Sequence, residues 1–334
     1  MHMKKSKLPK SNRKDKKSNK KKYKIKNWHE YNEELVNRGS LDFWVEQGMI
    51  KSWTITVVDE TGKIIRRKRG AQRKYSDHAI ETVLMIGKVF HQRLRQAEGF
   101  ARSVFNQANV SLEIPDYTTL SRRGENVVVP MPKQAKERLV AILDSTGLKV
   151  FGEGEWKVRK HGVSKRRTWI KMHLFVDADG EIRVAMATDP SVDDAKAGID
   201  LLKMEEQPIE KTIDDGAYDK GKFYQICQKK HISQVVVPPR KGARIWKHGN
   251  HKSDRHPRDE NLRAVRKSSK KQWKIVSGYH ARSRVENTMF RYKTVLGDRI
   301  SARNSKTQQT EVLIGCKILN LMWQNGRPQS YAVT

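Results

Sequence analysis

Short apolar runs alternate with amphipathic segments through the middle of this chain, and that alternation limits the possible folds more than any other feature. Residues 139–143 form a nearly continuous apolar run, as expected of a strand that is buried on both faces. The other strand candidates are residues 169–177, 182–188, 209–215 and 235–237, and the helix candidates between them are residues 194–204 and 220–230. Strands that alternate with helices predict an α/β domain.

Further segments complete this domain. The sequence Asp-Ala-Asp-Gly at residues 177–180 predicts a turn that joins two of the strands into a hairpin. Residues 281–296 and 312–323 have the periodicity of helices. The segment between them and the last strand, residues 240–274, shows no clear period. We therefore expect an insertion there.

The N-terminal part of the chain has a different, purely helical pattern. Apolar residues spaced four, three and four apart follow Ser76, which is placed as an N-cap, and a second apolar stripe begins at Leu94. A third short segment follows a Pro-Asp breaker, and its small, polar or cationic side chains are Thr118, Thr119, Ser121, Arg122 and Arg123. Three such helices predict a helix-turn-helix unit that binds DNA, although many small helical bundles with a basic end show the same pattern.

The net charge points to a polyanionic partner. The chain carries 69 Lys and Arg against 37 Asp and Glu, a formal net charge of +32, which an enzyme of neutral small molecules does not need. Residues 1–26 hold thirteen of these cations and one acid, and residues 240–274 hold thirteen and three. The first segment is expected to be disordered, either as a DNA contact or as a solubilising or cloning-derived tail. The second is expected to be an insertion or a DNA-facing loop.

Other features exclude several classes of protein. No apolar run approaches the roughly 20 residues of a membrane-spanning helix, and no apolar signal core follows the basic N-terminus. The two cysteines, Cys227 and Cys316, lack the spacing of a disulfide framework or a zinc site. His248, His251 and His256 lie among cations without a suitable zinc-binding partner. We expect a cytoplasmic protein that does not contact a membrane.

Two aspartates occupy positions where open α/β sheets carry functional side chains. Asp144 and Asp215 each stand at the C-terminal end of an expected strand. Carboxylates about 4 Å apart repel by roughly 4 kcal/mol at an effective dielectric near 20, so two that converge imply a bound cation or a raised pKa. With oxygen ligands alone the cation is expected to be Mg²⁺ or Mn²⁺, and two such ions can activate water for attack on a phosphodiester.

A third carboxylate stands in the most specific pattern of the chain. Tyr279, Arg282, Glu286 and Lys293 are spaced three, four and seven apart, which places them within about 60° of one another on a helix. An adjoining apolar stripe that begins at Val285 would seat this helix on the sheet. Arg282 and Lys293 would then hold phosphate near the carboxylates. The spacing is equally consistent with a solvated helix face that carries a weak Arg282–Glu286 ion pair.

Sequence motifs distributed along the chain carry a family resemblance. The matching segments are residues 28, 31–32, 37–39, 115–122, 143–148, 164–169, 215–219 and 238–242. Together they resemble transposases of the IS-five insertion-sequence family, whose Tyr-Arg-Glu-Lys signature matches Tyr279, Arg282, Glu286 and Lys293. The resemblance covers nearly the whole chain after residue 26.

The resemblance implies an RNase H-like mixed sheet flanked by helices, preceded by a helix-turn-helix-like module that binds DNA. Its Asp-Asp-Glu triad, which binds two Mg²⁺ ions, falls by position on Asp144, Asp215 and Glu286. Asp214 is expected to be only a neighbour, because strand alternation points one of the two adjacent aspartates to the site and the Asp-Gly-Ala-Tyr-Asp motif selects Asp215.

The expected organisation has four parts. A disordered basic tail spans residues 1–26, a helical DNA-binding region 27–130, a catalytic domain 131–326 and a C-terminal tail 327–334. The implied function is transposition: binding of terminal inverted repeats, metal-dependent cleavage of DNA, and strand transfer by at least a dimer. The alternatives are a catalytically silent DNA-binding regulator or nucleoid-type protein, and a nuclease that cuts without joining.

Overall fold

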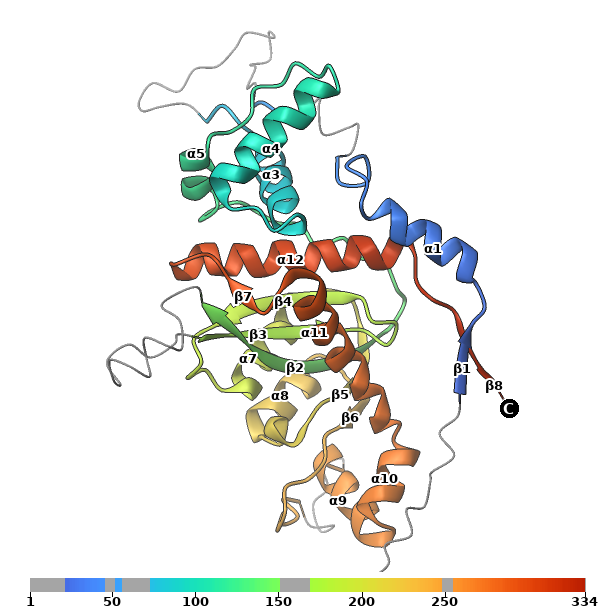
Figure 1. Cartoon of the computed structure of the whole chain (residues 1–334). Coiled ribbons are helices and arrows are strands. Elements are labelled where there is room, and N and C mark those ends of the chain that lie inside the picture. Colours follow the sequence, from blue (N-terminus) through green and yellow to red (C-terminus); the bar gives the residue numbers. More distant parts are fainter. Residues whose placement is uncertain (1–21, 46–51, 56–72, 151–168, 248–254, 334) are drawn as a thin grey trace, which may run out of the picture.

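The computed structural model describes residues 22–45, 52–55, 73–150, 169–247 and 255–333. Figure 1 shows a small helical module, the long helix α12 (Ser305–Asn325) beneath it, and a sheet with helices on both faces beneath that. Within the described residues, no helix is both long enough and apolar enough to cross a bilayer. The motif residues 164–168 lie outside the described residues.

The three helices expected in the N-terminal region are confirmed. They are α3 (Asp77–Val89), α4 (Leu94–Gln107) and α5 (Tyr117–Arg123). The Ser76 hydroxyl caps α3, where it accepts a hydrogen bond from the backbone of Ala79 at 3.1 Å. The apolar faces of the helices enclose a core of their own, which includes Ile80, Ala101 and Leu120. We call these three helices the helical module.

A mixed sheet forms the centre of the molecule, which confirms the predicted α/β fold. Its strands are β2 (Leu139–Val150), β3 (Trp169–Val176), β4 (Ile182–Thr188), β5 (Ile209–Ile213) and β6 (Gln234–Val236). Their order in space is β4-β3-β2-β5-β6, and the short strand β7 (Arg299–Ile300) pairs with the end of β2. The β2–β3–β4 pairings are antiparallel, whereas β5 and β6 continue the sheet in parallel with β2.

Helices cover both faces of the sheet. α7 (Asp194–Met204) and α8 (Gly221–Lys229) pack on one face, over a core that contains Leu143. α11 (Ser283–Leu296) and α12 pack on the other, over a core that contains Ile142. Neighbouring residues of β2 therefore point into two different cores, which explains why this strand has a continuous apolar run.

Two predicted strand ends are wrong. β2 does not stop at Asp144 but continues to Val150, because β3 pairs with it in antiparallel register along residues 142–149. β5 stops at Ile213, two residues before Asp215, and the chain then enters the 3₁₀ turn η2 (Gly216–Tyr218). Asp144 thus lies within a strand and Asp215 in a connection.

The basic segment 240–274 contains helices, contrary to the expectation of a loop. Its described part includes α9 (Pro257–Lys267) and the start of α10 (Lys270–Val276). Arg258 anchors the segment: its Nε donates to the buried carboxylate of Asp219 at 2.7 Å, and its guanidinium lies 4.0 Å from the centre of the Trp246 ring. A buried charge requires such a partner, so a long-range ion pair holds a segment whose sequence shows no period.

The two ends of the chain pair with each other. β1 (Lys22–Ile25) and β8 (Ser330–Val333) form an antiparallel ribbon, although the sequence predicts tails at both places. Each strand supplies the hydrogen-bonding partner that the other lacks in isolation. Figure 1 shows this ribbon beside the sheet domain. Residues 1–21 lie outside the described residues.

Helix α1 (Trp28–Asn37) belongs to the same end of the molecule and not to the helical module. It is followed by Arg38, whose Nη2 donates to the carbonyls of Met322 and Gly326 at 3.0 and 2.8 Å. These carbonyls end α12, where a cation is favoured by the helix dipole. The expected unit of residues 27–130 is therefore divided in space.

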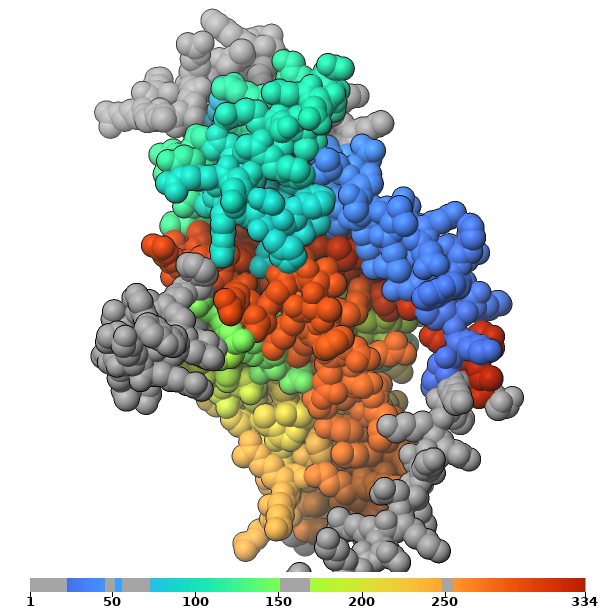
Figure 2. Space-filling view, in the orientation of Figure 1, coloured from blue at the N-terminus to red at the C-terminus, as the bar shows by residue number. Residues whose placement is uncertain are grey.

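Helix α12 joins the helical module to the sheet. One side packs on β4 and the other on α3, where Lys88 pairs with Glu311 at 2.8 Å. Met85 and Ile86 of α3 belong to the same apolar core as the inner residues of the sheet. Figure 2 shows the module seated directly on α12. Helix α3 therefore contributes both to the core of the helical module and to the core of the sheet.

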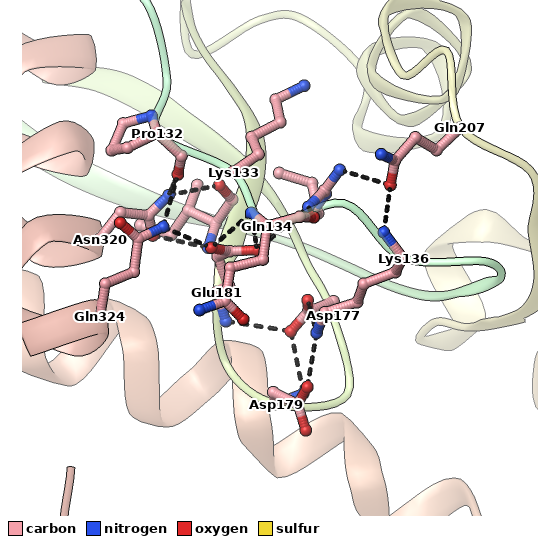
Figure 3. A network of polar contacts seen from close by, with 12 residues as sticks. Pro132, Lys133, Gln134, Lys136, Asp177, Asp179, Glu181, Gln207, Asn320 and Gln324 are labelled. Atoms are coloured by element: carbon pink, nitrogen blue, oxygen red, sulfur yellow. Dashed lines mark hydrogen bonds and ion pairs between the residues drawn. The ribbon is translucent and has the colours of Figure 1, made fainter. Parts of the chain in front are cut away.

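A network of hydrogen bonds and ion pairs stabilises the segment around Pro132 and Gln134, which connects the helical module to the sheet (Figure 3). The side-chain amide of Asn320 acts as a substitute for a neighbouring strand: its Oδ1 accepts from Ile182 N at 2.8 Å and its Nδ2 donates to the Ile182 carbonyl at 2.7 Å. Nδ2 also donates to the carbonyl of Pro132 at 3.0 Å. Nearby, Nη1 of the buried Arg183 donates to the carbonyl of Gln134 at 2.7 Å. The connecting segment is thereby held to both α12 and β4.

Candidate active site

Parallel pairing of β2 and β5 brings Asp144 and Asp215 to the same face of the sheet. Ile142 pairs with Ile213 at the end of this pairing, and each aspartate follows two residues later. Asp215 is still extended, with φ −80° and ψ 178°. Because side chains two residues apart in an extended chain share a face, both carboxylates lie on the side covered by α11.

Asp214 and Asp215 have different surroundings. Asp214 is fully buried, accepts hydrogen bonds from Leu143 N at 3.1 Å and Thr212 Oγ1 at 2.7 Å, and has its pKa raised well above the usual value by burial. Asp215 is half-buried and accepts a hydrogen bond from Ala217 N at 2.7 Å. Asp214 therefore links β5 to β2 inside the core, and Asp215 is the accessible member of the pair.

Arg282 connects Glu286 to Asp144. It ends the 3₁₀ turn η3 (Tyr279–Arg282), and Glu286 lies in the first turn of α11. The guanidinium Nη1 donates to Asp144 Oδ2 at 2.7 Å, and Nη2 donates to Glu286 Oε1. The Arg282–Glu286 ion pair expected of a solvated helix face is thus present. Arg282 also pairs with Asp144 of β2, so the ion pair is part of a bridge between helix and sheet.

The electrostatics of Asp144 show that the three carboxylates act on one another. Burial raises the pKa of Asp144, whereas the backbone N–H of Ser145 and the charge of Arg282 lower it. The charges of Asp215 and Glu286 raise this pKa further. The charged form of Asp144 is therefore disfavoured by its surroundings and gains from any additional cation.

Lys293 and Tyr279 border this group of carboxylates. Lys293 Nζ donates to Thr146 Oγ1 at 2.6 Å, two residues beyond Asp144 on the same strand. The Tyr279 ring packs against Trp273, with 5.7 Å between ring centres, and burial raises the pKa of its hydroxyl. The predicted set is therefore assembled, although a 3₁₀ turn and an α-helix share it and no single regular helix does.

The carboxylates fit a hard divalent cation by donor chemistry and charge. Asp144, Asp215 and Glu286 supply oxygen ligands only, which Mg²⁺ and Mn²⁺ prefer. Among the described residues, Arg282 alone forms an ion pair with any of them. No three His, Cys, Asp or Glu side chains of the described ranges stand close enough together to hold an ion already. A cation bound by all three carboxylates would compete with Arg282 for Asp144 and Glu286.

Two protein-family models match the chain. One, described as a transposase DDE domain, matches residues 36–153, and a second with the same description matches residues 135–321. The second match spans more than half of the 334 residues and contains all three carboxylates. The chain belongs to the DDE transposase family. The mixed sheet with helices on both faces is consistent with the RNase H-like catalytic domain expected of a DDE transposase.

In this DDE transposase, the α5 side chains that were predicted to contact DNA fall into two groups: those bonded within the helical module and those exposed on its surface. The hydroxyls of Thr118 and Thr119 donate to the carboxylate of Asp116, and these hydrogen bonds hold its pKa well below the usual range. Arg123 donates to the carboxylate of Asp77. Thr118, Thr119 and Arg123 therefore stabilise the helical module itself, and their contact with DNA stays a prediction.

Ser121 and Arg122 remain exposed on α5. They line a groove whose other wall contains Arg93, the N-cap of α4, and Arg95 of its first turn, two residues that the sequence did not predict. A signal for them existed, because two cations at the beginning of a helix oppose its dipole. The apolar periodicity of α4 carries no information about the polar side chains of its first turn.

Proposed function

We propose that this member of the DDE transposase family is the transposase of an insertion sequence of the IS-five family. It binds the terminal inverted repeats of the element, cleaves the DNA there and joins the freed ends to target DNA. The single observation that carries the proposal is the Arg282 bridge between Asp144 and Glu286, on the face of the sheet to which Asp215 also belongs. A regulator that only binds DNA does not need such a charged arrangement.

Each side chain has a distinct task in the proposed mechanism. Asp144, Asp215 and Glu286 would hold two Mg²⁺ ions, which when bound activate water and neutralise charge on the leaving oxygen. Arg282 orients Asp144 and favours its charged form, because its charge lowers a pKa that burial raises. Lys293, held at Thr146, places a positive charge beside the carboxylates for a DNA phosphate.

Both proposed steps exchange one P–O bond for another. In cleavage, a water oxygen bonds to phosphorus, the bond from phosphorus to the 3′ oxygen breaks, and the 3′ oxygen leaves as a hydroxyl. In joining, that 3′-hydroxyl oxygen bonds to a phosphorus of the target strand and displaces another 3′ oxygen, so no external energy source is consumed. The joining of two ends requires that at least a dimer hold both.

Conservative substitutions at the carboxylates test the proposed function. We expect Asp144→Asn, Asp215→Asn and Glu286→Gln each to reduce Mg²⁺-dependent cleavage by at least a thousandfold, because the charge of one ligand is lost. Cleavage and joined products are measured by sequencing gels with duplexes that carry the inverted repeats flanking the gene. DNA affinity should remain within about threefold of the wild type.

The matched control is Glu210→Gln, which removes an exposed carboxylate of β5 away from the site. It should cleave and join like the wild type. Cleavage without any joined product would leave a nuclease, and binding without Mg²⁺-dependent cleavage would leave a regulator. Either result overturns the proposed function.

A further inference from the structure

The helical module contains a groove that is lined by several arginines. It lies between the first turn of α4 and helix α5 and has a volume of about 660 Å³. Its described walls include Arg93, Arg95, Tyr117, Ser121 and Arg122, and none of the described lining residues is acidic. Three arginines therefore line this part of the groove without an acidic residue among them.

The guanidinium of Arg95 stacks on an aromatic ring and is exposed to a ligand. Its central carbon lies 4.5 Å from the centre of the Tyr117 ring, and both side chains are exposed. Stacking on an aromatic ring holds the plane of a guanidinium while its N–H edge stays available for a phosphate. In the described part of the chain, neither Arg95 nor Arg122 forms an ion pair with a carboxylate.

Other arginines of the same module serve its internal structure. Arg123 pairs with Asp77, and Arg102 pairs with Glu98 at 2.5 Å. Arg95 stands instead where folding gains little from it, since it lies in the first turn of α4 and opposes the helix dipole. An anion in the groove would offset this unfavourable charge.

The groove is also connected to the strand that carries Asp144. Arg93 donates a hydrogen bond to Ser301 Oγ, directly after β7. β7 pairs with the last residues of β2, in register from Lys149 to Arg299. The groove is thereby linked to the sheet through Arg93, Ser301 and β7.

We propose that this groove binds the phosphate backbone of double-stranded DNA, with Arg95 and Arg122 as its principal contacts. The inference rests on the proposed function, which makes DNA the polyanion that this protein handles. Backbone contacts of this kind fix position and orientation and carry no sequence information. The groove therefore adds affinity for every DNA sequence to about the same degree.

Salt-dependent binding tests the groove. Each lost phosphate contact should lower the slope of log K against log salt by about 0.9, which corresponds to about fivefold weaker binding at 150 mM salt. We expect the double variant Arg95→Gln/Arg122→Gln to lose about 1.8 in slope and about thirtyfold in affinity. Fluorescence anisotropy measures both, with a labelled inverted-repeat duplex and a scrambled duplex of equal length.

Two matched variants control for charge and folding. Lys203→Gln/Lys229→Gln removes two exposed cations of α7 and α8, and the slope should stay at the wild-type value. Arg95→Lys/Arg122→Lys keeps both charges, so it should retain most of the slope. An unchanged slope in the glutamine variant, or an equal loss in the Lys203/Lys229 control, overturns the proposal.

The outcome is separable from that of the proposed function. DNA binding is measured without Mg²⁺, so the salt slopes report on the groove whether or not the protein cleaves DNA. If the wild type neither cleaves nor joins DNA, the proposed function fails, while the salt slopes still report on the groove. If the wild type cleaves and joins but the slopes do not differ, only the groove proposal fails.

Discussion

The contact between Asn320 and the edge of the sheet gives a stability prediction whose size follows from the structure. β4 is the edge strand, and the N–H and carbonyl of Ile182 point away from β3 toward the Asn320 amide at 2.8 and 2.7 Å. Asn320→Leu keeps a similar volume but removes both hydrogen bonds. Two buried backbone groups are then left without a partner, at a cost of about 1–3 kcal/mol each.

The carbonyl of Pro132 is less affected, because Gln324 Nε2 also donates to it at 3.2 Å. We therefore expect Asn320→Leu to lower the free energy of unfolding by about 2–6 kcal/mol, a large part of the 5–15 kcal/mol that is typical of a folded domain. Urea unfolding monitored by tryptophan fluorescence measures the loss. Hydrogen exchange should show faster exchange at the Ile182 amide.

Asn325→Leu is the control at the end of the same helix, because this asparagine is exposed and its side-chain hydrogen bond to Glu34 lies at the surface and leaves no backbone group unpaired. It should change the free energy of unfolding by no more than about 0.5 kcal/mol. A loss below 1 kcal/mol for Asn320→Leu, or unchanged exchange at Ile182, would refute the argument that this amide takes the place of a neighbouring strand.

Two other perturbations follow from the site and the core. Arg282→Gln removes a charged hydrogen bond to Asp144 worth about 1.5–3 kcal/mol. Without Mg²⁺ the variant should therefore be less stable than the wild type. Because the arginine no longer competes for the carboxylates, added Mg²⁺ should raise the unfolding midpoint of the variant more than that of the wild type. Burial lowers the pKa of His173 from 6.5 to about 4. Its neutral form therefore stabilises the fold above pH 6.5, and roughly 3 kcal/mol is lost as the pH falls to 4, a loss that His173→Gln should abolish in urea unfolding series.

Each of these two predictions has a control. Arg299→Gln removes an exposed arginine outside the carboxylate group, and Mg²⁺ should shift its midpoint as it shifts that of the wild type. Equal Mg²⁺ shifts in Arg282→Gln and the wild type would contradict competition between arginine and cation. The exposed His29→Gln should keep the wild-type acid response, and the reasoning fails if His173→Gln keeps it too.

Periodicity predicted most elements because each has an apolar face that folding must bury. The expected helix at residues 194–204 and the expected strand at residues 182–188 agree with the structure at both ends. The segment 240–274 was missed because its described helices are held by the Arg258–Asp219 ion pair, which joins positions 39 residues apart. No local pattern contains such a contact.

The candidate site was likewise predicted in part by local spacing, and in part it depends on long-range contacts. Spacing predicted that Tyr279, Arg282, Glu286 and Lys293 share a face, and the apolar stripe beside them is buried as expected. It did not predict that Arg282 binds Asp144, because that contact depends on where α11 rests on β2. The sequence did not predict the groove with its arginines for a similar reason. Helices α4 and α5 form the two walls of the groove only when they pack together.

The three carboxylates remain the centre of the proposed function. The sequence by itself determined the class of fold, the helices and strands with strong periodicity, and the residues Asp144, Asp215 and Glu286 as candidates, because these depend on local spacing and recognisable motifs. Only the tertiary structure decided which aspartate of the pair 214–215 is accessible, that Arg123 pairs with Asp77 inside the helical module, and that one guanidinium joins sheet and helix. Those properties depend on burial and on distances between segments far apart in the chain, and local sequence carries neither.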